Sequence, residues 1–270
     1  IRKNGWYGRE LMPFGSELAL TPGLTQPERI YVKIFGAPIL GLRVRARTIL
    51  PFLDQIPDVH RIADAGCGRG MITLACAKRF AAAEVFGVDL DEDQNMVNSE
   101  IAKRAGFKNV QFVAMDAMKL PELGRFDLII STDMLEHLYD DSGAVKMFCK
   151  ALEPGGHLLV HVPHLTRNIF GWQRVNWMDI DGHVRPGYTK DELIRLLTKG
   201  GLRVKTCVYN YNTIETLASD ISKLITGAKE RKKGLYALVF PLLLFSSFLG
   251  SFYRSQKSGS GLVALAVRET

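Results

Sequence analysis

The chain has 270 residues, of which 47% are hydrophobic and 23% are charged, a balance that is typical of folded globular proteins and excludes intrinsic disorder. Its four cysteines, Cys67, Cys76, Cys149 and Cys207, form neither a CxxC pair nor a zinc-ligand spacing, so a disulfide scaffold and a structural zinc module are both disfavoured. The net charge of +7 allows an anionic partner but does not choose among nucleic acid, a phospholipid surface and an acidic small molecule.

The order of predicted elements indicates an α/β fold. Residues 1–58 are expected to form an N-terminal helical extension, joined through Pro51 and Pro57 to a domain over 59–270. In this domain, short apolar runs alternate with segments of helical period, the pattern of a parallel sheet covered by helices. The predicted strands are 61–65, 84–89, 109–116, 126–131, 157–162, 202–209 and 261–267. The predicted helices are 71–80, 94–105, 142–152 and a segment that begins with a capping box at Thr189.

A glycine-rich turn follows the first predicted strand, in the sequence DAGCGRG over 64–70. Glycines let backbone N–H groups approach a ligand, and the helix that follows adds the positive end of its dipole. Asp89 ends the second strand, 23 residues after Gly66, near the position of the ribose-binding acid in dinucleotide folds. Asp64, two residues before the first glycine, would repel a pyrophosphate but attract an ammonium or sulfonium group. The turn therefore favours S-adenosylmethionine.

Five motifs occur in order along the chain: DAGCGRG (64–70), GVDLD (87–91), MDA (115–117), FDLIIS (126–131) and LEPGG (152–156). With these motifs the chain resembles the class I S-adenosylmethionine-dependent methyltransferases, in the small-molecule group that includes the ubiquinone and menaquinone methyltransferases. The resemblance covers about residues 58–209 and 261–268. It implies a Rossmann-like, seven-stranded sheet whose last strand is antiparallel, with the cofactor at the carboxyl ends of the strands.

The resemblance also implies which residues bind the cofactor S-adenosylmethionine: Asp64, Gly66, Cys67, Gly68, Asp89, Leu90, Asp116, Ala117 and Ser131. Asp89 would bind both ribose hydroxyls, Leu90 would pack on the adenine, and Asp116 would accept a hydrogen bond from its N6 amine. Ser131 would lie near the methionine end. Arg69 stands where the family commonly has Thr or Ser, which implies a modest local change. No metal site is predicted.

Methyl transfer is an in-line displacement from a sulfonium, and much of its acceleration can come from holding donor and acceptor in line in a dry pocket. A base is needed only if the acceptor must lose a proton. The candidate catalytic residues are Asp133, His137 and His183, because histidine suits deprotonation of a phenol or enol hydroxyl. Packing at a helix start is an open alternative for His137, as loop ordering is for His183. His161 is expected to be satisfied inside the core.

A hydrophobic helical insertion, about 212–260, replaces the hairpin that the family usually has before the last strand. Its segment 234–253 carries no charge and is long enough to span a bilayer. It follows a basic cluster that consists of Lys223, Lys229, Arg231, Lys232 and Lys233. A single crossing would separate the last strand from its sheet, so the topology disfavours it. The open alternatives are a lid broken at Pro241, an interfacial membrane anchor and a dimer surface. We expect the lid and anchor roles to coincide and to admit a lipophilic acceptor.

The sequence therefore predicts a methyltransferase acting on a small, hydrophobic or lipid-like acceptor, with O-methylation preferred over C- or N-methylation. A nucleic-acid methyltransferase is supported by the charge alone, and STDM (131–134) replaces the Asn-Pro-Pro-Tyr type of box used on base amines. A non-enzymatic, membrane-associated scaffold is disfavoured by the intact cofactor residues. The chain opens IRKNGWYG without a signal-peptide pattern, so we expect a cytoplasmic protein, with a peripheral position at the inner face of a membrane as an option. The oligomeric state is left open.

Overall fold

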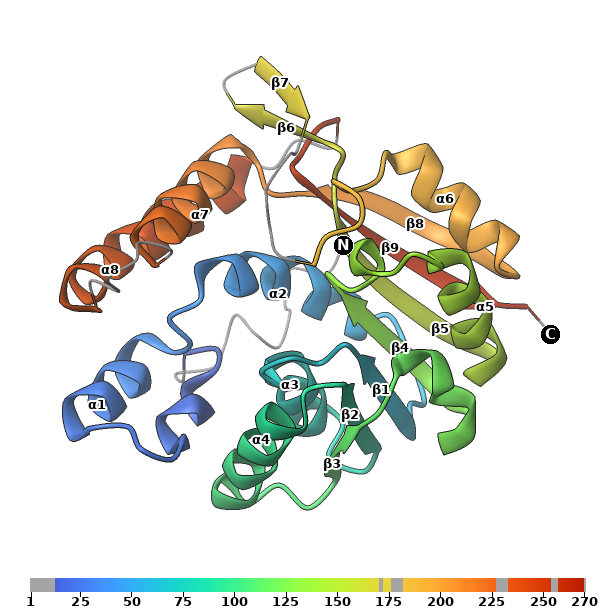
Figure 1. Cartoon of the computed structure of the whole chain (residues 1–270), viewed down its shortest axis with the longest axis horizontal. Coiled ribbons are helices and arrows are strands. Elements are labelled where there is room, and N and C mark those ends of the chain that lie inside the picture. The colour runs from blue at the N-terminus through green and yellow to red at the C-terminus, as the bar shows by residue number, and fades with distance from the viewer. Residues whose placement is uncertain (1–12, 170–171, 176–181, 227–232, 254–256, 270) are drawn as a thin grey trace.

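The computed structural model describes residues 13–169, 172–175, 182–226, 233–253 and 257–269. The strands of its main sheet are β1 (Arg61–Ala65), β2 (Glu84–Asp89), β3 (Val110–Ala114), β4 (Phe126–Thr132), β5 (Leu152–Pro163), β8 (Leu202–Asn210) and β9 (Gly261–Arg268). In the described part of the chain, these seven strands follow the order β3, β2, β1, β4, β5, β9, β8 (Figure 1). The pairs among β1 to β5 are parallel, whereas β9 is antiparallel to both β5 and β8. The predicted sheet with an antiparallel last strand is confirmed.

Helices cover both faces of this sheet. They are α2 (Leu40–Leu53), α3 (Met71–Arg79), α4 (Glu92–Ala105), α5 (Asp141–Ala151) and α6 (Lys190–Lys199). Because side chains alternate across a strand, Ala63 and Ile129 face one side of the sheet, while Ile62 and Ile130 face the other. Helices α5 and α6 pack on the first side, and α2 and α3 pack on the second. Two short 3₁₀ helices, η3 (Ala117–Leu123) and η4 (Leu135–His137), flank β4.

Local sequence signals explain where helices begin. The predicted capping box of α6 is present: Thr189 Oγ1 accepts from the N–H of Glu192 at 3.2 Å, and Glu192 Oε2 accepts from the N–H of Thr189 at 2.8 Å. At the start of α4, the side chain of Asp91 accepts from the N–H of Gln94 at 2.9 Å. Each bond satisfies an N–H group that has no partner within the helix.

The described part of the N-terminal extension is helical, as predicted. It contains η2 (Ser16–Leu20), α1 (Gln26–Phe35) and α2. The α2 side chains of Ile49 and Leu53 are fully buried against α3 and the sheet. The extension and the sheet therefore share one hydrophobic core.

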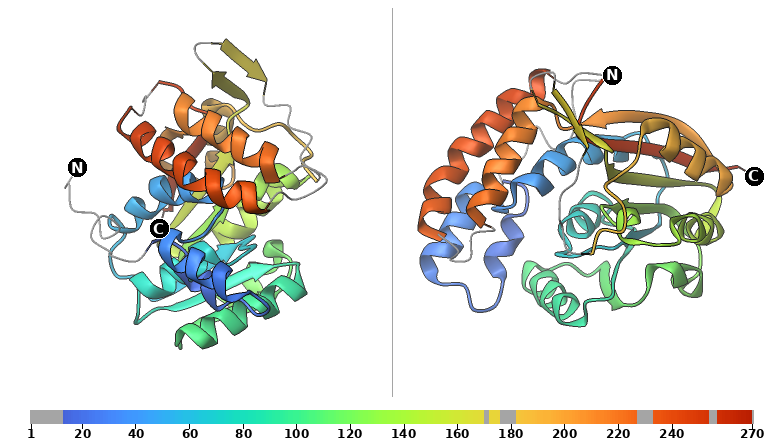
Figure 2. Two further views of the ribbon diagram at one scale, coloured as in Figure 1. Left: turned by 90° about the vertical axis from the view of Figure 1, so that its left-hand side faces the viewer. Right: turned by 45° about the horizontal axis from the view of Figure 1, so that its top comes forward.

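The insertion between β8 and β9 forms two long helices, α7 (Thr213–Thr226) and α8 (Lys233–Gly250), which continue into η5 (Ser251–Tyr253). They lie side by side, with α2 between them and the sheet (Figures 1 and 2). The α8 helix continues through Pro241, so the predicted break is wrong. Proline removes one backbone hydrogen bond. The burial of Phe240 and Leu243 against Leu40 of α2 and Ala218 of α7 offsets that loss.

Among the described residues, the helical segment Lys233–Tyr253 is long and apolar enough to cross a membrane. Its packing is that of a helix lying beside the domain: Tyr31 Oη donates to the carbonyl of Ala237 at 2.9 Å, and Tyr236 Oη donates to that of Pro38 at 3.1 Å. The strand β9 that follows pairs with β5 and β8 inside the sheet. A crossing of this segment would therefore have to separate β9 from its sheet partners. Much of the basic cluster before α8 lies at 229–232, outside the described residues.

Candidate active site

The glycine-rich turn places Asp64 at the carboxyl end of β1. Its side chain is 2% exposed, and the hydroxyl of Thr73 on α3 donates to its Oδ2 at 2.6 Å. Burial raises the pKa of Asp64 to about 6; the hydrogen bond from Thr73 opposes this shift, and the charge of Asp89 adds to it. Asp64 therefore changes its charge just below neutral pH.

The glycines allow the backbone conformation of the turn. Gly66 and Gly68 have φ angles of 75° and 48°, and a Cβ on Gly66 would lie 2.8 Å from Cγ of Met134. The N–H groups of Gly66 and Cys67 donate to the carbonyl of Val88 at 2.8 and 3.1 Å. The sequence predicts N–H groups that face a ligand, but these two are used within the fold. What the turn offers a ligand is space and a nearby carboxylate.

Asp89 ties the turn to the end of β2. Its Oδ2 accepts from the N–H of Gly68 at 2.8 Å, and its Oδ1 accepts from the N–H of Asp91 at 3.1 Å. A carboxylate oxygen can accept more than one hydrogen bond, so Asp89 keeps capacity for a ligand. Leu90 beside it is exposed. Across from them, Asp116 caps η3 by accepting from the N–H of Met118 at 2.9 Å.

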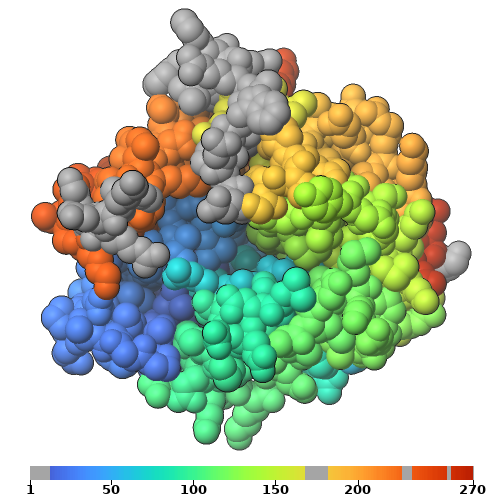
Figure 3. Space-filling model, viewed as in Figure 1, coloured from blue at the N-terminus to red at the C-terminus, as the bar shows by residue number. Residues whose placement is uncertain are grey.

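A cavity of about 630 Å³ opens over the carboxyl ends of β1, β2 and β4. Its lining includes these predicted cofactor residues: Asp64, Gly66, Cys67, Gly68, Asp89, Leu90, Asp116 and Ala117. Ser131 is fully buried and does not line it, whereas its neighbour Thr132 does. The physical reason is alternation along β4, which directs successive side chains to opposite faces. Figure 3 shows a recess on this face of the molecule.

The N-terminal helix α2 also contributes to this cavity, which the sequence did not predict. Leu42 and Arg45 lie in its wall, together with Ile39 just before the helix. Leucines and alternating arginines on an amphipathic helix carry no signal that they face a ligand. Only the packing of α2 beside α3 places them there.

A second cavity of about 260 Å³ adjoins the first. The two cavities share Arg45, Asp133 and His137 in their walls. The insertion helix α7 contributes Ser219 and Lys223 to the smaller cavity. Residues that are distant in sequence therefore line the smaller cavity, and most of them have polar side chains.

Asp133 is held by two cationic or proton-donating partners. Arg45 Nη1 lies 2.7 Å from its Oδ2, and His161 Nδ1 lies 2.5 Å from its Oδ1. Burial raises the pKa of Asp133, but Arg45 and His161 outweigh burial and hold the pKa well below its usual value. This environment keeps Asp133 ionised, which suits it to orienting charged groups. His161 is buried on β5, as expected, but it is only partly satisfied: Nδ1 bonds to Asp133, whereas Nε2 has no hydrogen-bond partner within the described structure.

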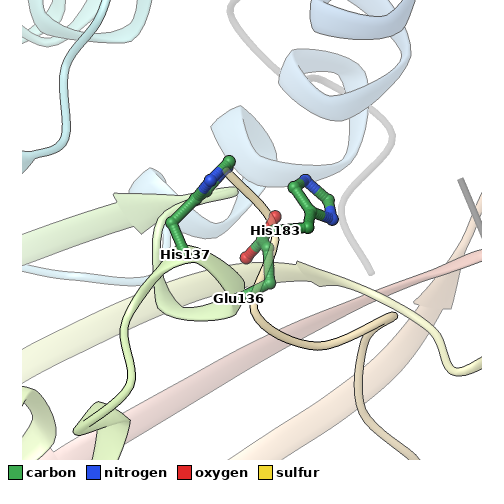
Figure 4. A group of neighbouring side chains, drawn as sticks. All are labelled: Glu136, His137 and His183. Carbon is green, nitrogen blue, oxygen red and sulfur yellow. The ribbon is translucent and has the colours of Figure 1, made fainter. Parts of the chain in front are cut away.

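His137 and His183, both predicted as catalytic, lie together. Their rings meet edge to face with centroids 4.5 Å apart. Burial lowers the pKa of His183, and the neighbouring His137 lowers it further, so His183 is neutral at pH 7. Glu136 joins them, as Figure 4 shows. It is fully buried, which the sequence does not predict for a glutamate.

Comparison with known proteins agrees with this geometry. The profile of the family described as "Methyltransferase domain" matches residues 41–206. Ubiquinone biosynthesis O-methyltransferase of Idiomarina loihiensis is 30% identical over 152 residues, which cover 53% of this chain and 61% of that protein. The protein of the same name from Ralstonia nicotianae is 31% identical over 105 residues, or 38% and 43% of the two chains. The matched regions thus span less than two thirds of these relatives.

Solved structures share the fold. A putative sarcosine dimethylglycine methyltransferase from Galdieria sulphuraria superposes with a TM-score of 0.56 at 13% identity, covering 85% of this chain and 84% of that one. Geranyl diphosphate methyltransferase in complex with GPP and sinefungin superposes with a TM-score of 0.55 at 16% identity, covering 84% and 78%. At these identities the likeness shows the architecture alone.

Proposed function

Because the chain belongs to the methyltransferase-domain family, we propose that it transfers a methyl group from S-adenosylmethionine to a hydroxyl of a small, hydrophobic or lipid-like acceptor. The observation that carries the proposal is the pair of adjoining cavities. One contains the predicted cofactor residues, the other contains histidines, and they share Arg45, Asp133 and His137. Ligands in the two cavities would meet at this shared wall. The ubiquinone O-methyltransferase relatives support an oxygen acceptor.

The larger cavity fits S-adenosylmethionine by its donor set and its size. Asp64 and Asp89 supply carboxylates for a ligand that has ammonium, sulfonium and ribose hydroxyl groups, and Leu90 and Ala117 supply apolar surface for a base. The buried hydroxyl of Thr132 in the wall has no hydrogen-bond partner within the described structure. The volume of about 630 Å³ lies in the usual range for cofactor sites. The cofactor, when bound, supplies a methyl group on a positively charged sulfur.

The chain's own residues prepare the acceptor. Burial keeps His183 neutral, so its imidazole offers a lone pair for activating a hydroxyl near pH 7. Asp133, held ionised by Arg45 and His161, keeps the Arg45 side chain in place in the wall that the two cavities share. A bound cofactor and acceptor would displace water from the shared wall, which would strengthen the electrostatic interactions there. We assign the loss of the acceptor's hydroxyl proton to the part of the smaller cavity where His137 and His183 lie.

The insertion is proposed to hold the protein at a membrane surface. Along α8, large apolar side chains are exposed at spacings of three and four residues: Leu235, Leu238, Leu242, Phe245 and Leu249, followed by Phe252. This stripe forms one continuous helical face. Lys233, the last residue of the basic cluster, stands at the helix start, and cations favour an anionic lipid surface. We therefore infer a peripheral position, with α8 lying in the interface.

Cofactor binding and transfer test the proposed activity directly. Isothermal titration calorimetry with S-adenosylmethionine is expected to show one site per chain. Incubation with methyl-labelled S-adenosylmethionine and an organic extract of cells that lack the protein is expected to yield labelled products one methylene heavier by mass spectrometry. Absence of cofactor binding would refute the assignment, and label found only in nucleic acid would refute the acceptor class.

Vesicle flotation tests the membrane surface. We expect the protein to float with anionic phosphatidylglycerol vesicles and less with neutral phosphatidylcholine vesicles. The pair Leu242→Ser and Phe245→Ser is expected to abolish flotation, because both side chains leave the exposed stripe. Met96→Ser changes an equally exposed apolar residue on α4 and serves as the matched control. Flotation that is unchanged by the pair would contradict this role of α8.

A further inference from the structure

Glu136, His137 and His183 form a compact cluster at the edge of the smaller cavity. One potential ligand atom from each side chain lies within 4.8 Å of the others. Glu136 and His137 come from η4, while His183 comes from the loop before α6 (Figure 4). His137 also lines the larger cavity, so the cluster stands where the proposed cofactor and acceptor sites meet.

Glu136 provides an independent sign that something is bound here. Its side chain is 0% exposed, and neither carboxylate oxygen has a hydrogen-bond partner within the described structure. A buried carboxyl group without partners is costly, and such groups in native proteins usually serve a ligand or an ion. A bound cation would give both carboxylate oxygens a partner.

His137 is oriented as a metal ligand is. His137 Nδ1 lies 3.0 Å from the carbonyl oxygen of Gly182, so this nitrogen donates and Nε2 keeps its lone pair. A backbone carbonyl on the second ring nitrogen is the common support for a metal-binding histidine. The N–H of Val184 donates to the carbonyl of Glu136 at 3.0 Å. These two backbone bonds bracket His183 and fix both segments together.

The surrounding charges leave room for a cation. Arg45 is paired with Asp133, and Arg185 is paired with Asp141. The charge of each arginine is therefore largely compensated before a cation enters. Two imidazoles and one carboxylate suit zinc and related first-row metals, whereas magnesium and calcium prefer oxygen ligands alone.

We propose that Glu136, His137 and His183 bind a divalent cation of the zinc type, whose open coordination position takes the hydroxyl oxygen of the acceptor. The role assigned to the acceptor rests on the function proposed above. Coordination lowers the pKa of a bound hydroxyl. Its O–H bond then breaks, the electron pair stays on the coordinated oxygen, and the proton passes to water at the cavity mouth. The sequence predicts no metal because Glu136 and His183 are separated by β5 and the hairpin of β6 (Thr166–Ile169) and β7 (Trp172–Val175).

Cobalt titration of the metal-free protein tests the site without using activity. Co²⁺ is expected to give visible ligand-field absorption that saturates at one equivalent and is displaced by Zn²⁺. Glu136→Gln and His183→Ala are each expected to weaken Co²⁺ binding by at least about tenfold, because each removes a ligand. His183 lies in a partly exposed loop, so His183→Ala tests the site even if Glu136→Gln disturbs folding. His60→Ala is the control, since His60 is exposed at the amino end of β1, on the opposite edge of the sheet.

The outcomes separate this proposal from the proposed function. Unchanged Co²⁺ affinity in both ligand variants would overturn the metal site, whatever the enzyme does. Full methyl transfer after chelation by EDTA would overturn the role of the cation but would leave the methyltransferase assignment standing. S-adenosylmethionine binding measured by calorimetry on the chelated protein is expected to persist, because Asp64 and Asp89 are not ligands of the cluster. Loss of that binding would overturn the separation of the two sites.

Discussion

Lowering the pH from 7 to 5 is expected to weaken S-adenosylmethionine binding about tenfold, because Asp64 becomes protonated. Asp64 is buried at the carboxyl end of β1, and burial raises its pKa to about 6. With that pKa, about nine in ten Asp64 carboxyls are ionised at pH 7 and about one in ten at pH 5. A neutral carboxyl no longer attracts the ammonium or sulfonium group of the ligand. The α-amino group of the ligand stays protonated over this range.

Calorimetry between pH 5 and 7 checks this expectation. Asp64→Asn should bind weakly, with nearly the same Kd at both pH values. Thr73→Val removes the hydroxyl that donates to Asp64 at 2.6 Å, so it should raise the pKa and move the transition to higher pH. Asp93→Asn, on the exposed first turn of α4, should behave as the unaltered protein. A Kd that is constant between pH 5 and 7 would refute the role of Asp64.

The same raised pKa has a signature in the free protein. Between the unfolded pKa near 4 and the folded pKa of about 6, the folded state holds the Asp64 proton more often than the unfolded state. The contribution of Asp64 to the free energy of unfolding therefore falls as the pH rises through this window. Denaturant titrations at pH 4 and 6 should show a smaller fall for Asp64→Asn than for the unaltered protein. An equal fall in both proteins would contradict the raised pKa.

Three further substitutions test other parts of the fold. Asp89→Ala should raise the Kd of S-adenosylmethionine by at least about 100-fold in calorimetry, because it removes charge-assisted hydrogen bonds worth about 1.5–3 kcal/mol each. An unchanged Kd would remove Asp89 from the site. Gly66→Ala should lower the free energy of unfolding, measured in urea, by about 1–2 kcal/mol, because φ of residue 66 is 75° and the new Cβ would meet Met134. A free energy of unfolding equal to that of the unaltered protein would contradict the tight turn. Thr189→Ala should lower the free energy of unfolding by about 1 kcal/mol in the same assay, because it removes the capping box. An unchanged free energy of unfolding would mean that the capping box adds little stability.

The parallel part of the sheet was predictable because its signals are local. Each strand is a short apolar run, and the carboxyl ends of parallel strands meet at one edge of the sheet. Asp64 and Asp89 could therefore be placed near each other from their positions at two strand ends. Ser131 shows the limit of this argument. The end of a strand can be predicted within a residue or two, but a shift of one residue reverses the face, and Thr132 lines the cavity instead.

The remaining site features depend on tertiary packing. Arg45 belongs to a helix that the sequence assigns to an extension, yet its guanidinium reaches Asp133 after β4. Glu136 is a charged residue in a short 3₁₀ turn, and the loop that carries His183 bonds to its backbone, with the N–H of Val184 donating to its carbonyl. The continuation of α8 through Pro241 likewise depends on its contacts with α2 and α7. None of these contacts has a spacing or composition that could be recognised in the chain alone.

The insertion gives the proposed acceptor class a physical basis, because α7 contacts both the smaller cavity and α8. Helix α7 contributes Ser219 and Lys223 to the cavity wall and packs against α8 through Ala218, while Asp220 pairs with Arg167 of β6. A helix is roughly 10 Å in diameter, so a bilayer that covers α8 would lie about that far from α7. An acceptor with a polar head and a long apolar tail could then keep its tail in the lipid while its head occupies the cavity. Such an acceptor would not have to leave the membrane completely, which removes most of the cost of exposing its tail to water.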